Sequence, residues 1–119
     1  MKKLTEKSKR RNRRKKHIRK RISGTTDRPR MTVYKSNKNM YVQVIDDTEG
    51  KSIASASNIE KQNRNLKKCV ADAEKLGEII GNRLKEKNIN SVVFDRNGYI
   101  YHGIIKAIAD GTRKTGIQF

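Results

Sequence analysis

Hydrophobic and polar residues alternate along residues 28–47, RPRMTVYKSNKNMYVQVIDD. A period of two predicts two strands, and residues 35–39 then form the turn of a hairpin. One face is apolar, so we expect it to be buried: it carries Met31, Val33, Met40, Val42 and Val44. The opposite face is mostly polar and carries Thr32, Tyr34, Tyr41, Gln43 and Ile45.

A weaker alternation in residues 51–57, KSIASAS, predicts a third strand built from small side chains. Residues 58–65 are polar and predict a loop, in which the pattern Ser57-x-x-Glu60 is typical of the start of a short helical turn. Apolar residues then recur at spacings of three and four, which predicts a helix over residues 65–87. Because Cys69 lies in its apolar stripe, we expect a buried thiol. Gly77 and Gly81 indicate tight packing against backbone.

The end of the chain predicts one more strand and one more helix. Residues 91–95, SVVFD, are typical of a strand buried on both faces of a sheet. A strand, a helix and another strand favour a right-handed crossover, so this fourth strand should be parallel to its partner. Residues 103–114 predict the second helix, which Gly111 could end early. The predicted fold class is therefore α/β, with a mixed four-stranded sheet: three antiparallel strands, then helix, strand and helix.

Positive charge is concentrated before the hairpin. The 119 residues include 30 Lys and Arg against 12 Asp and Glu, a net charge of +18. Residues 1–30 hold 15 basic and 2 acidic residues (+13), which leaves 15 and 10 (+5) for residues 31–119. Such an excess indicates a polyanionic partner. Residues 1–22 have no apolar stripe, so we expect an arm over residues 1–27 that is disordered when free and becomes helical once phosphates neutralise it. Residues 28–119 form the globular domain.

Other features exclude several classes of protein. With Cys69 as its one cysteine, the chain forms no internal disulfide, and a reducing compartment is expected. No apolar run is long enough to span a membrane, and the N-terminus lacks the apolar core of a signal peptide. We expect no cofactor and no metal, because no glycine pattern typical of phosphate loops follows a strand and His17 has no second ligand within helical reach.

Three segments closely resemble the family of bacterial large-subunit ribosomal proteins numbered eighteen, which bind 5S ribosomal RNA (rRNA). They are residues 28–47, VVFDRNGYIYHG at 92–103 and KAIADGTRKTGIQF at 106–119, and the similarity runs from about residue 7 to residue 119. The resemblance implies a non-enzymatic protein of the cytoplasmic ribosome that attaches 5S rRNA to 23S rRNA in the central protuberance, beside another 5S-binding protein. It implies a ribonuclease-H-like motif and no homo-oligomer.

The predicted RNA contacts fall into three groups. The alternation places Tyr34 and Tyr41 where they stack on bases, with Lys35 and Lys38 beside them for phosphates. From the basic arm we expect contacts by Lys9, Arg10, Arg11, Arg13, Arg14, Lys15, Lys16, His17, Arg19, Lys20 and Arg21. The resemblance implies further contacts by Arg28, Arg30, Lys35, Ser36, Asn37, Lys38, Asn39, Tyr41 and Gln43, and by Arg96, Tyr101 and His102 in the motif that follows the fourth strand.

The sequence departs from the family pattern at a few positions. Asn97 stands where the family usually has a second glycine, and Ile104 where it usually has a basic residue, which puts an RNA contact at that helix start in doubt. Gly111 and Thr112 replace residues that favour helix more strongly.

Functions other than RNA binding account for only parts of the sequence. The polar strand face is also compatible with a solvated surface. A nuclease would use Asp46, Asp47, Glu49 and Asp95 around metals, but three of these lie in one turn of ordinary composition. A DNA-binding architectural protein would share the arm, yet the chain offers no recognition helix or minor-groove wedge. We interpret His102 as capping or orienting the last helix rather than as a base.

Overall fold

The computed structural model of the chain describes residues 6–19 and 23–119. The arm contains helix α1 (Glu6–Arg19), and the body contains three strands, a 3₁₀ turn, a helix, a fourth strand and a last helix. In chain order these are β1 (Arg30–Lys35), β2 (Met40–Asp46), β3 (Lys51–Ser57), η1 (Lys61–Asn63), α2 (Val70–Glu86), β4 (Val93–Asp95) and α3 (Gly103–Lys114). The predicted α/β class is confirmed.

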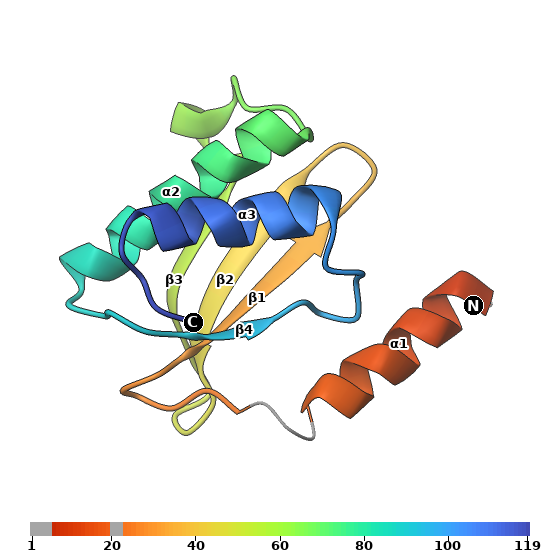
Figure 1. Ribbon diagram of the computed structural model, residues 1–119, viewed down its shortest axis with the longest axis horizontal. Coiled ribbons are helices and arrows are strands. Elements are labelled where there is room, and N and C mark those ends of the chain that lie inside the picture. The colour runs from red at the N-terminus through yellow and green to blue at the C-terminus, as the bar shows by residue number, and fades with distance from the viewer. Residues whose placement is uncertain (1–5, 20–22) are drawn as a thin grey trace.

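Within the described residues the strands form one four-stranded sheet with the order β3-β2-β1-β4 (Figure 1). β1, β2 and β3 are antiparallel, and β4 is parallel to β1, with Met31 opposite Phe94. The predicted parallel crossover is therefore confirmed. Lys35 still pairs with Met40, so the hairpin loop has the four residues 36–39 rather than the five predicted.

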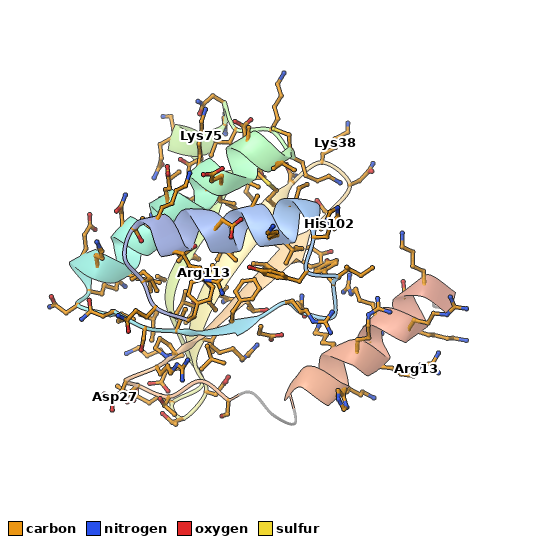
Figure 2. All side chains as sticks on the ribbon, viewed as in Figure 1. Arg13, Asp27, Lys38, Lys75, His102 and Arg113 are labelled. Atoms are coloured by element: carbon orange, nitrogen blue, oxygen red, sulfur yellow. The ribbon has the colours of Figure 1, made fainter. Side chains whose placement is uncertain are left out.

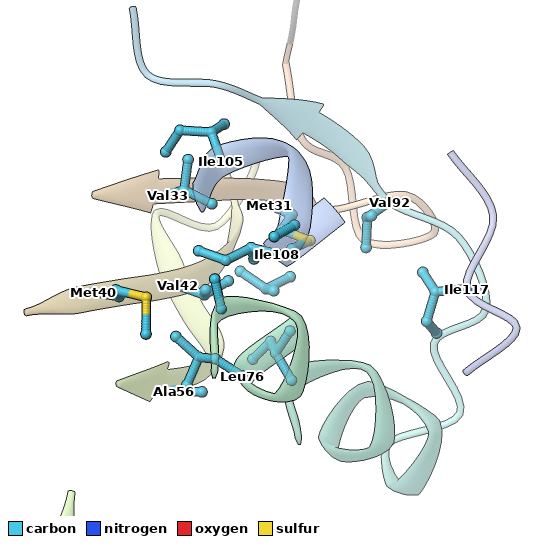
Figure 3. Packing of buried hydrophobic residues seen from close by; sticks show 14 of the residues in the cluster. Met31, Val33, Met40, Val42, Ala56, Leu76, Val92, Ile105, Ile108 and Ile117 are labelled. Atoms are coloured by element: carbon cyan, nitrogen blue, oxygen red, sulfur yellow. The ribbon is translucent and has the colours of Figure 1, made fainter. Parts of the chain in front are cut away.

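The apolar face of the hairpin is buried, as predicted. None of Met31, Val33, Met40, Val42 and Val44 exposes more than 1% of its surface. Helices α2 and α3 lie across this face and fill the core with apolar side chains from both elements (Figures 1 and 3). The members from the helices include Ala73, Leu76, Ile80, Leu84, Ile105 and Ile108. No helix of the described residues is long and apolar enough to cross a membrane.

α2 begins at Val70, five residues later than the periodicity predicts. Cys69 is the extended residue before the helix and is exposed, so the prediction of a buried thiol is wrong. The reason is a local bond: the Asp72 carboxylate accepts a hydrogen bond from the Lys67 amide at 2.8 Å, which stabilises a turn there. Leu66 is still buried, but it reaches the core from that turn and not from the helix.

Two glycines bring the backbones of α2 and α3 into contact. A Cβ atom at Gly77 or at Gly111 would lie less than 3.0 Å from a carbonyl oxygen of the other helix, that of Ile108 or of Glu74. The predicted packing against backbone is thus confirmed at Gly77, but at Gly81 a Cβ atom would meet the side chain of Thr115 and not backbone. Gly111 does not end α3, which continues to Lys114, because the glycine lies inside the helix crossing.

β4 is shorter than predicted and lies at the edge of the sheet. Val93 and Phe94 are half-buried, so the prediction of burial on both faces is wrong for this strand. The end of the chain packs on it: the rings of Phe94 and Phe119 stack with centroids 5.6 Å apart. The 3₁₀ turn η1 is present where a helical turn was expected, and the Glu60 side chain accepts a hydrogen bond from the Ser57 amide at 3.0 Å.

Candidate nucleic-acid interface

Two tyrosines stand side by side on the solvent face of the hairpin. Tyr34 and Tyr41 are directly opposite each other in the β1–β2 register, and their ring centroids are 5.6 Å apart. Tyr34 is 46% exposed, Tyr41 is half-buried and Gln43 is exposed. A hollow of about 200 Å³ adjoins these three side chains. This face of the hairpin therefore carries aromatic rings and an amide at the surface, as the alternation predicts.

The hairpin loop is a tight, basic projection. The Ser36 amide donates to the Asn39 carbonyl at 2.9 Å, and the Asn39 amide donates to the Ser36 hydroxyl at 3.2 Å. These bonds leave Asn37 and Lys38 exposed at the tip, with the Lys38 side chain extending away from the body (Figure 2). Lys68, which was not among the predicted contacts, donates from Nζ to the Ser36 carbonyl at 3.1 Å and braces the loop.

α1 lies beside the segment that joins β4 to α3 (Figure 1). Arg11 donates from Nη1 to the Tyr99 hydroxyl at 2.9 Å, and its guanidinium carbon is 4.7 Å from the centroid of that ring. Arg14 donates from Nε to the Gly98 carbonyl at 2.8 Å. Gly98 is needed there, because a Cβ atom would lie only 2.5 Å from the Arg11 carbonyl oxygen. Two cations of the arm thus attach it to the body.

The other predicted residues of the arm face solvent or lie outside the described part. The exposed ones extend from the outer side of α1: Lys9, Arg10, Arg13, Lys16 and His17. Lys15 is half-buried, Arg19 is the last residue of the helix, and Lys20 and Arg21 lie outside the described residues. The helix therefore presents a row of cations to the side away from the body (Figure 2).

Tyr99 joins the arm to the hairpin, and the sequence interpretation did not single it out. Its hydroxyl accepts from the Lys35 amide at 3.3 Å and donates to the Lys35 carbonyl at 3.2 Å, and it also accepts from Arg11. The ammonium of Lys35 lies 5.6 Å from the centroid of the same ring. The motif NGYIYHG indicates a functional segment, because it sets three ring side chains close to a turn. It does not indicate which of the three bonds to the arm.

Arg30 is held inside the body, although the resemblance implies an RNA contact. It is 8% exposed, its Nε is 3.0 Å from Asp47 Oδ2, and its Nη1 is 2.7 Å from Oδ2 of the fully buried Asp95. The hydrogen bonds that Arg30 donates to Asp47, and next to Asp95, raise the pKa of this guanidinium although burial opposes the shift. We therefore leave Arg30 out of the proposed RNA surface. Arg28, two residues earlier, is exposed.

Comparison with known proteins decides the family. The family described as ribosomal L18 of archaea, bacteria, mitochondria and chloroplast matches residues 5–119. The large ribosomal subunit protein uL18 of Treponema denticola is 61% identical over 99% of this chain and 98% of the relative. The proteins of the same name from Treponema pallidum and Borrelia hermsii are 51% and 55% identical, each over at least 99% of both chains. The chain belongs to the ribosomal L18 family.

Membership in the L18 family agrees with the fold and with the basic surface. The protein is a structural component of the large ribosomal subunit rather than an enzyme, and its place is the ribosome in the cytoplasm. The resemblance that the three sequence segments indicate is confirmed over almost the full chain.

Three of the four acidic residues considered for a nuclease, Asp46, Asp47 and Asp95, have structural partners in this L18-family protein. Asp47 and Asp95 bind Arg30, and Asp47 also accepts from the Gly24 amide at 2.7 Å. Asp46 accepts from the hydroxyls of Thr48 and Thr26; the Thr48 bond is the main cause of a lowered pKa of Asp46. No group of three or more His, Cys, Asp or Glu in the described residues is placed to hold a metal ion.

The predicted residues that follow β4 are divided between the surface and the fold. Arg96 donates to the Tyr99 carbonyl at 2.7 Å and closes the turn. Tyr101 accepts from Arg113 at 2.9 Å and packs edge-on against Phe94. His102 is the N-cap residue of α3, as predicted, but its side chain makes no capping hydrogen bond. Its side chain is exposed at the start of α3 (Figure 2).

Proposed function

We propose that the protein binds 5S rRNA and attaches it to 23S rRNA in the central protuberance of the large subunit, next to another 5S-binding protein. The observation that carries the proposal is the adjacent pair of the exposed Tyr34 and the half-buried Tyr41. Arg11 of α1 lies 6.0 Å from the Tyr34 ring centroid, and the adjoining hairpin loop carries the exposed Lys38. Proteins read unpaired RNA bases by stacking them on aromatic rings and bind the backbone through Lys and Arg. In this proposal the partners are RNAs and one protein, not a second copy of the chain.

Unsatisfied polar atoms beside the tyrosines support the same surface. Thr32 and Asn97 are among the residues that line the 200 Å³ hollow, and the Thr32 hydroxyl and the Asn97 side-chain oxygen are buried without a hydrogen-bond partner among the described residues. A buried polar atom without a partner costs about 1–3 kcal/mol, so RNA binding that turned either side chain toward a hydrogen-bond donor of the RNA would recover part of this cost. The 2′-hydroxyl of RNA donates and accepts hydrogen bonds, and DNA lacks it.

For the arm we propose that residues 1–22 are disordered in the free protein and that RNA orders them. α1 has no apolar stripe, and the bonds that attach it to the body come from cations such as Arg11 and Arg14. Like charges along one helix repel until phosphates neutralise them. The boundary with the body is fastened: the Asp47 amide donates to the Gly24 carbonyl at 3.1 Å.

The test compares Tyr41→Ala with Tyr41→Phe, which keeps the ring. Stacking of one base on an aromatic side chain contributes about 1–3 kcal/mol, so Tyr41→Ala should weaken 5S rRNA binding by about one to two decades, while Tyr41→Phe should bind nearly as the wild type does. Neither change should move the thermal midpoint far, since Tyr41 lies outside the apolar core. An arm variant such as Arg13→Ala should weaken binding to every RNA alike.

Affinities are measured for 5S rRNA and for an unrelated RNA of equal length. A lower thermal midpoint for Tyr41→Ala with an unchanged ratio of the two affinities would contradict the proposal, because Tyr41 would then act in the core. Equal affinity of the wild-type protein for both RNAs would also contradict it.

A further inference from the structure

A cleft of about 730 Å³ separates α1 from the body. Sites for single small molecules have volumes of about 300–1,000 Å³, so the cleft has room for one nucleotide. Cations line it from both sides: Lys7, Arg11 and Arg14 belong to α1, and Lys35 and Lys68 belong to the body. Among the residues of the described chain that line the cleft, none is acidic. The charge of the wall therefore selects an anion.

The body side of the cleft also carries exposed apolar side chains. Ile100 is 72% exposed and Val70 is 55% exposed, the two largest values among the large apolar residues of the described chain. Both line this cleft, together with the half-buried Ile104. A site for phosphate alone has no use for two exposed aliphatic side chains, whereas contact with an apolar ligand surface would remove them from water.

Arg11 connects the cleft to the proposed RNA surface. Arg11 lies 4.7 Å from the ring centroid of Tyr99 inside the cleft and 6.0 Å from that of Tyr34 on the hairpin face. Lys35 lines the cleft and ends the strand that carries Tyr34. A strand of RNA on the tyrosine face can therefore continue into the cleft without leaving positive surface.

We propose that this cleft holds one unpaired nucleotide of the bound RNA, with its phosphate on the cations and its base against Ile100 and Val70. The inference rests on the proposed function and adds the kind of RNA element that the protein recognises. A paired base stays stacked inside its helix and cannot lie against the aliphatic side chains of the cleft. The ring face of a looped-out base is free to contact them. An acidic segment of a neighbouring protein fits the charge as well, but not the continuity with the tyrosine face.

The first experiment maps what touches position 100. A photo-reactive benzophenone amino acid replaces Ile100 in one protein and Ile59 in a matched control, since Ile59 is 53% exposed and does not line the cleft. Each protein is bound to 5S rRNA, irradiated, and the attached nucleotide is identified by primer extension. Position 100 should attach to one or two nucleotides that react with a 2′-hydroxyl acylating reagent in the free RNA. Position 59 should attach to none.

The second experiment measures affinity with paired variants. Ile100→Asp places a negative charge among the phosphates and should weaken 5S rRNA binding roughly tenfold, while Ile59→Asp should change it less than about twofold. Lys68→Ala should lower the slope of log affinity against log salt by about 1, and the exposed Lys61→Ala should leave it unchanged. Both isoleucines are exposed, so thermal midpoints should stay near that of the wild type.

The outcomes separate the two proposals. If the wild-type protein does not bind 5S rRNA, the proposed function fails, and this inference fails with it. If the wild type binds but position 100 attaches only to paired nucleotides, or to none, or Ile100→Asp binds as tightly as Ile59→Asp, the inference alone is refuted. Attachment of position 100 to a neighbouring protein in whole large subunits would also overturn it and assign the cleft to that protein.

Discussion

The two arginines around Pro29 give the sharpest test of how the body is built. Arg28 is exposed and Arg30 is buried between Asp47 and Asp95, although the sequence resemblance treats the two alike. We predict that Arg30→Met destabilises the fold and leaves the intrinsic RNA contacts intact. Arg28→Met should do the reverse.

The loss of stability in Arg30→Met depends on which carboxylate stays buried after it loses its partner. Asp95 is fully buried, and Arg30→Met removes the guanidinium that pairs with its carboxylate at 2.7 Å. The side chain of Asp47 is 29% exposed and can turn to water, so one stranded charge and not two sets the cost. Removing one partner of a buried ion pair costs about 3–5 kcal/mol, a large part of the roughly 5–15 kcal/mol by which domains are stable. A surface change such as Arg28→Met is worth about 0.5 kcal/mol or less.

The assay is urea denaturation followed by circular dichroism, with RNA affinity measured over a range of salt where each variant is folded. A second variant, Arg30→Met with Asp95→Asn, removes the stranded charge and keeps an acceptor for the Asn97 amide, so it should recover stability relative to Arg30→Met alone. Arg28→Met should lower the salt slope of RNA binding by about 1, and the Arg30 variants should not. Equal stability of the Arg28 and Arg30 single variants would refute this account, as would a lower salt slope for Arg30→Met.

Three other predictions follow from the arm, the helix crossing and one ion pair. Deleting residues 1–19 should flatten the slope of log affinity for RNA against log salt concentration, which for six to ten phosphate contacts is roughly −4 to −9 in the intact protein. Equal slopes for the truncated and intact proteins would exclude the arm as a main phosphate contact. Gly111→Ala should lower the free energy of unfolding by about 1–3 kcal/mol, because the new Cβ atom would clash with the Glu74 carbonyl oxygen. Asn82→Ala, at an exposed position of α2, should not lower it. Equal urea midpoints for the two variants would contradict the close crossing of the helices. Hydrogen bonds from Arg83 lower the pKa of Glu60 in the folded state, so this pair should stabilise the protein above about pH 4.5 and lose that contribution as the pH falls further. Glu60→Gln should therefore lose less stability than the wild type between pH 6 and pH 3. An equal loss of stability in the two proteins would refute the assignment.

Local patterns were enough to predict most of the fold. The alternation in residues 28–47 identified every buried apolar position of β1 and β2, because the side-chain period of a strand decides its face, but it did not identify the buried charged residues Arg30 and Asp46. The range predicted for the last helix, residues 103–114, matches α3. The start of α2 was placed too early, since Leu66 and Cys69 have helical spacing while the chain there forms a turn held by Asp72. A periodic pattern cannot distinguish a turn that buries one leucine from another turn of helix.

The candidate site was predictable only in part, because its key bonds join residues far apart in the sequence. Arg30 meets Asp95 across 65 positions, and Arg11 meets Tyr99 across 88. A basic residue next to a strand has the same local pattern whether it points to solvent or to a buried carboxylate. The count of charged residues therefore predicted a polyanionic partner. It could not distinguish the exposed Arg28 from the buried Arg30, and it did not identify Tyr99 or Lys68.

The buried ion pair also determines where the arm attaches. Arg30 holds Asp95, whose Oδ1 accepts from the Asn97 amide at 2.9 Å, and the turn that follows places Tyr99 against Lys35 and Arg11. That turn needs two left-handed residues, with φ of 54° at Asn97 and 78° at Gly98. Asparagine is one of the few residues other than glycine that adopts this conformation readily, so the departure from the family's second glycine keeps the turn. We therefore expect Arg30 to stabilise the turn that carries Tyr99, so that its loss lowers the stability of the protein and does not remove an RNA contact.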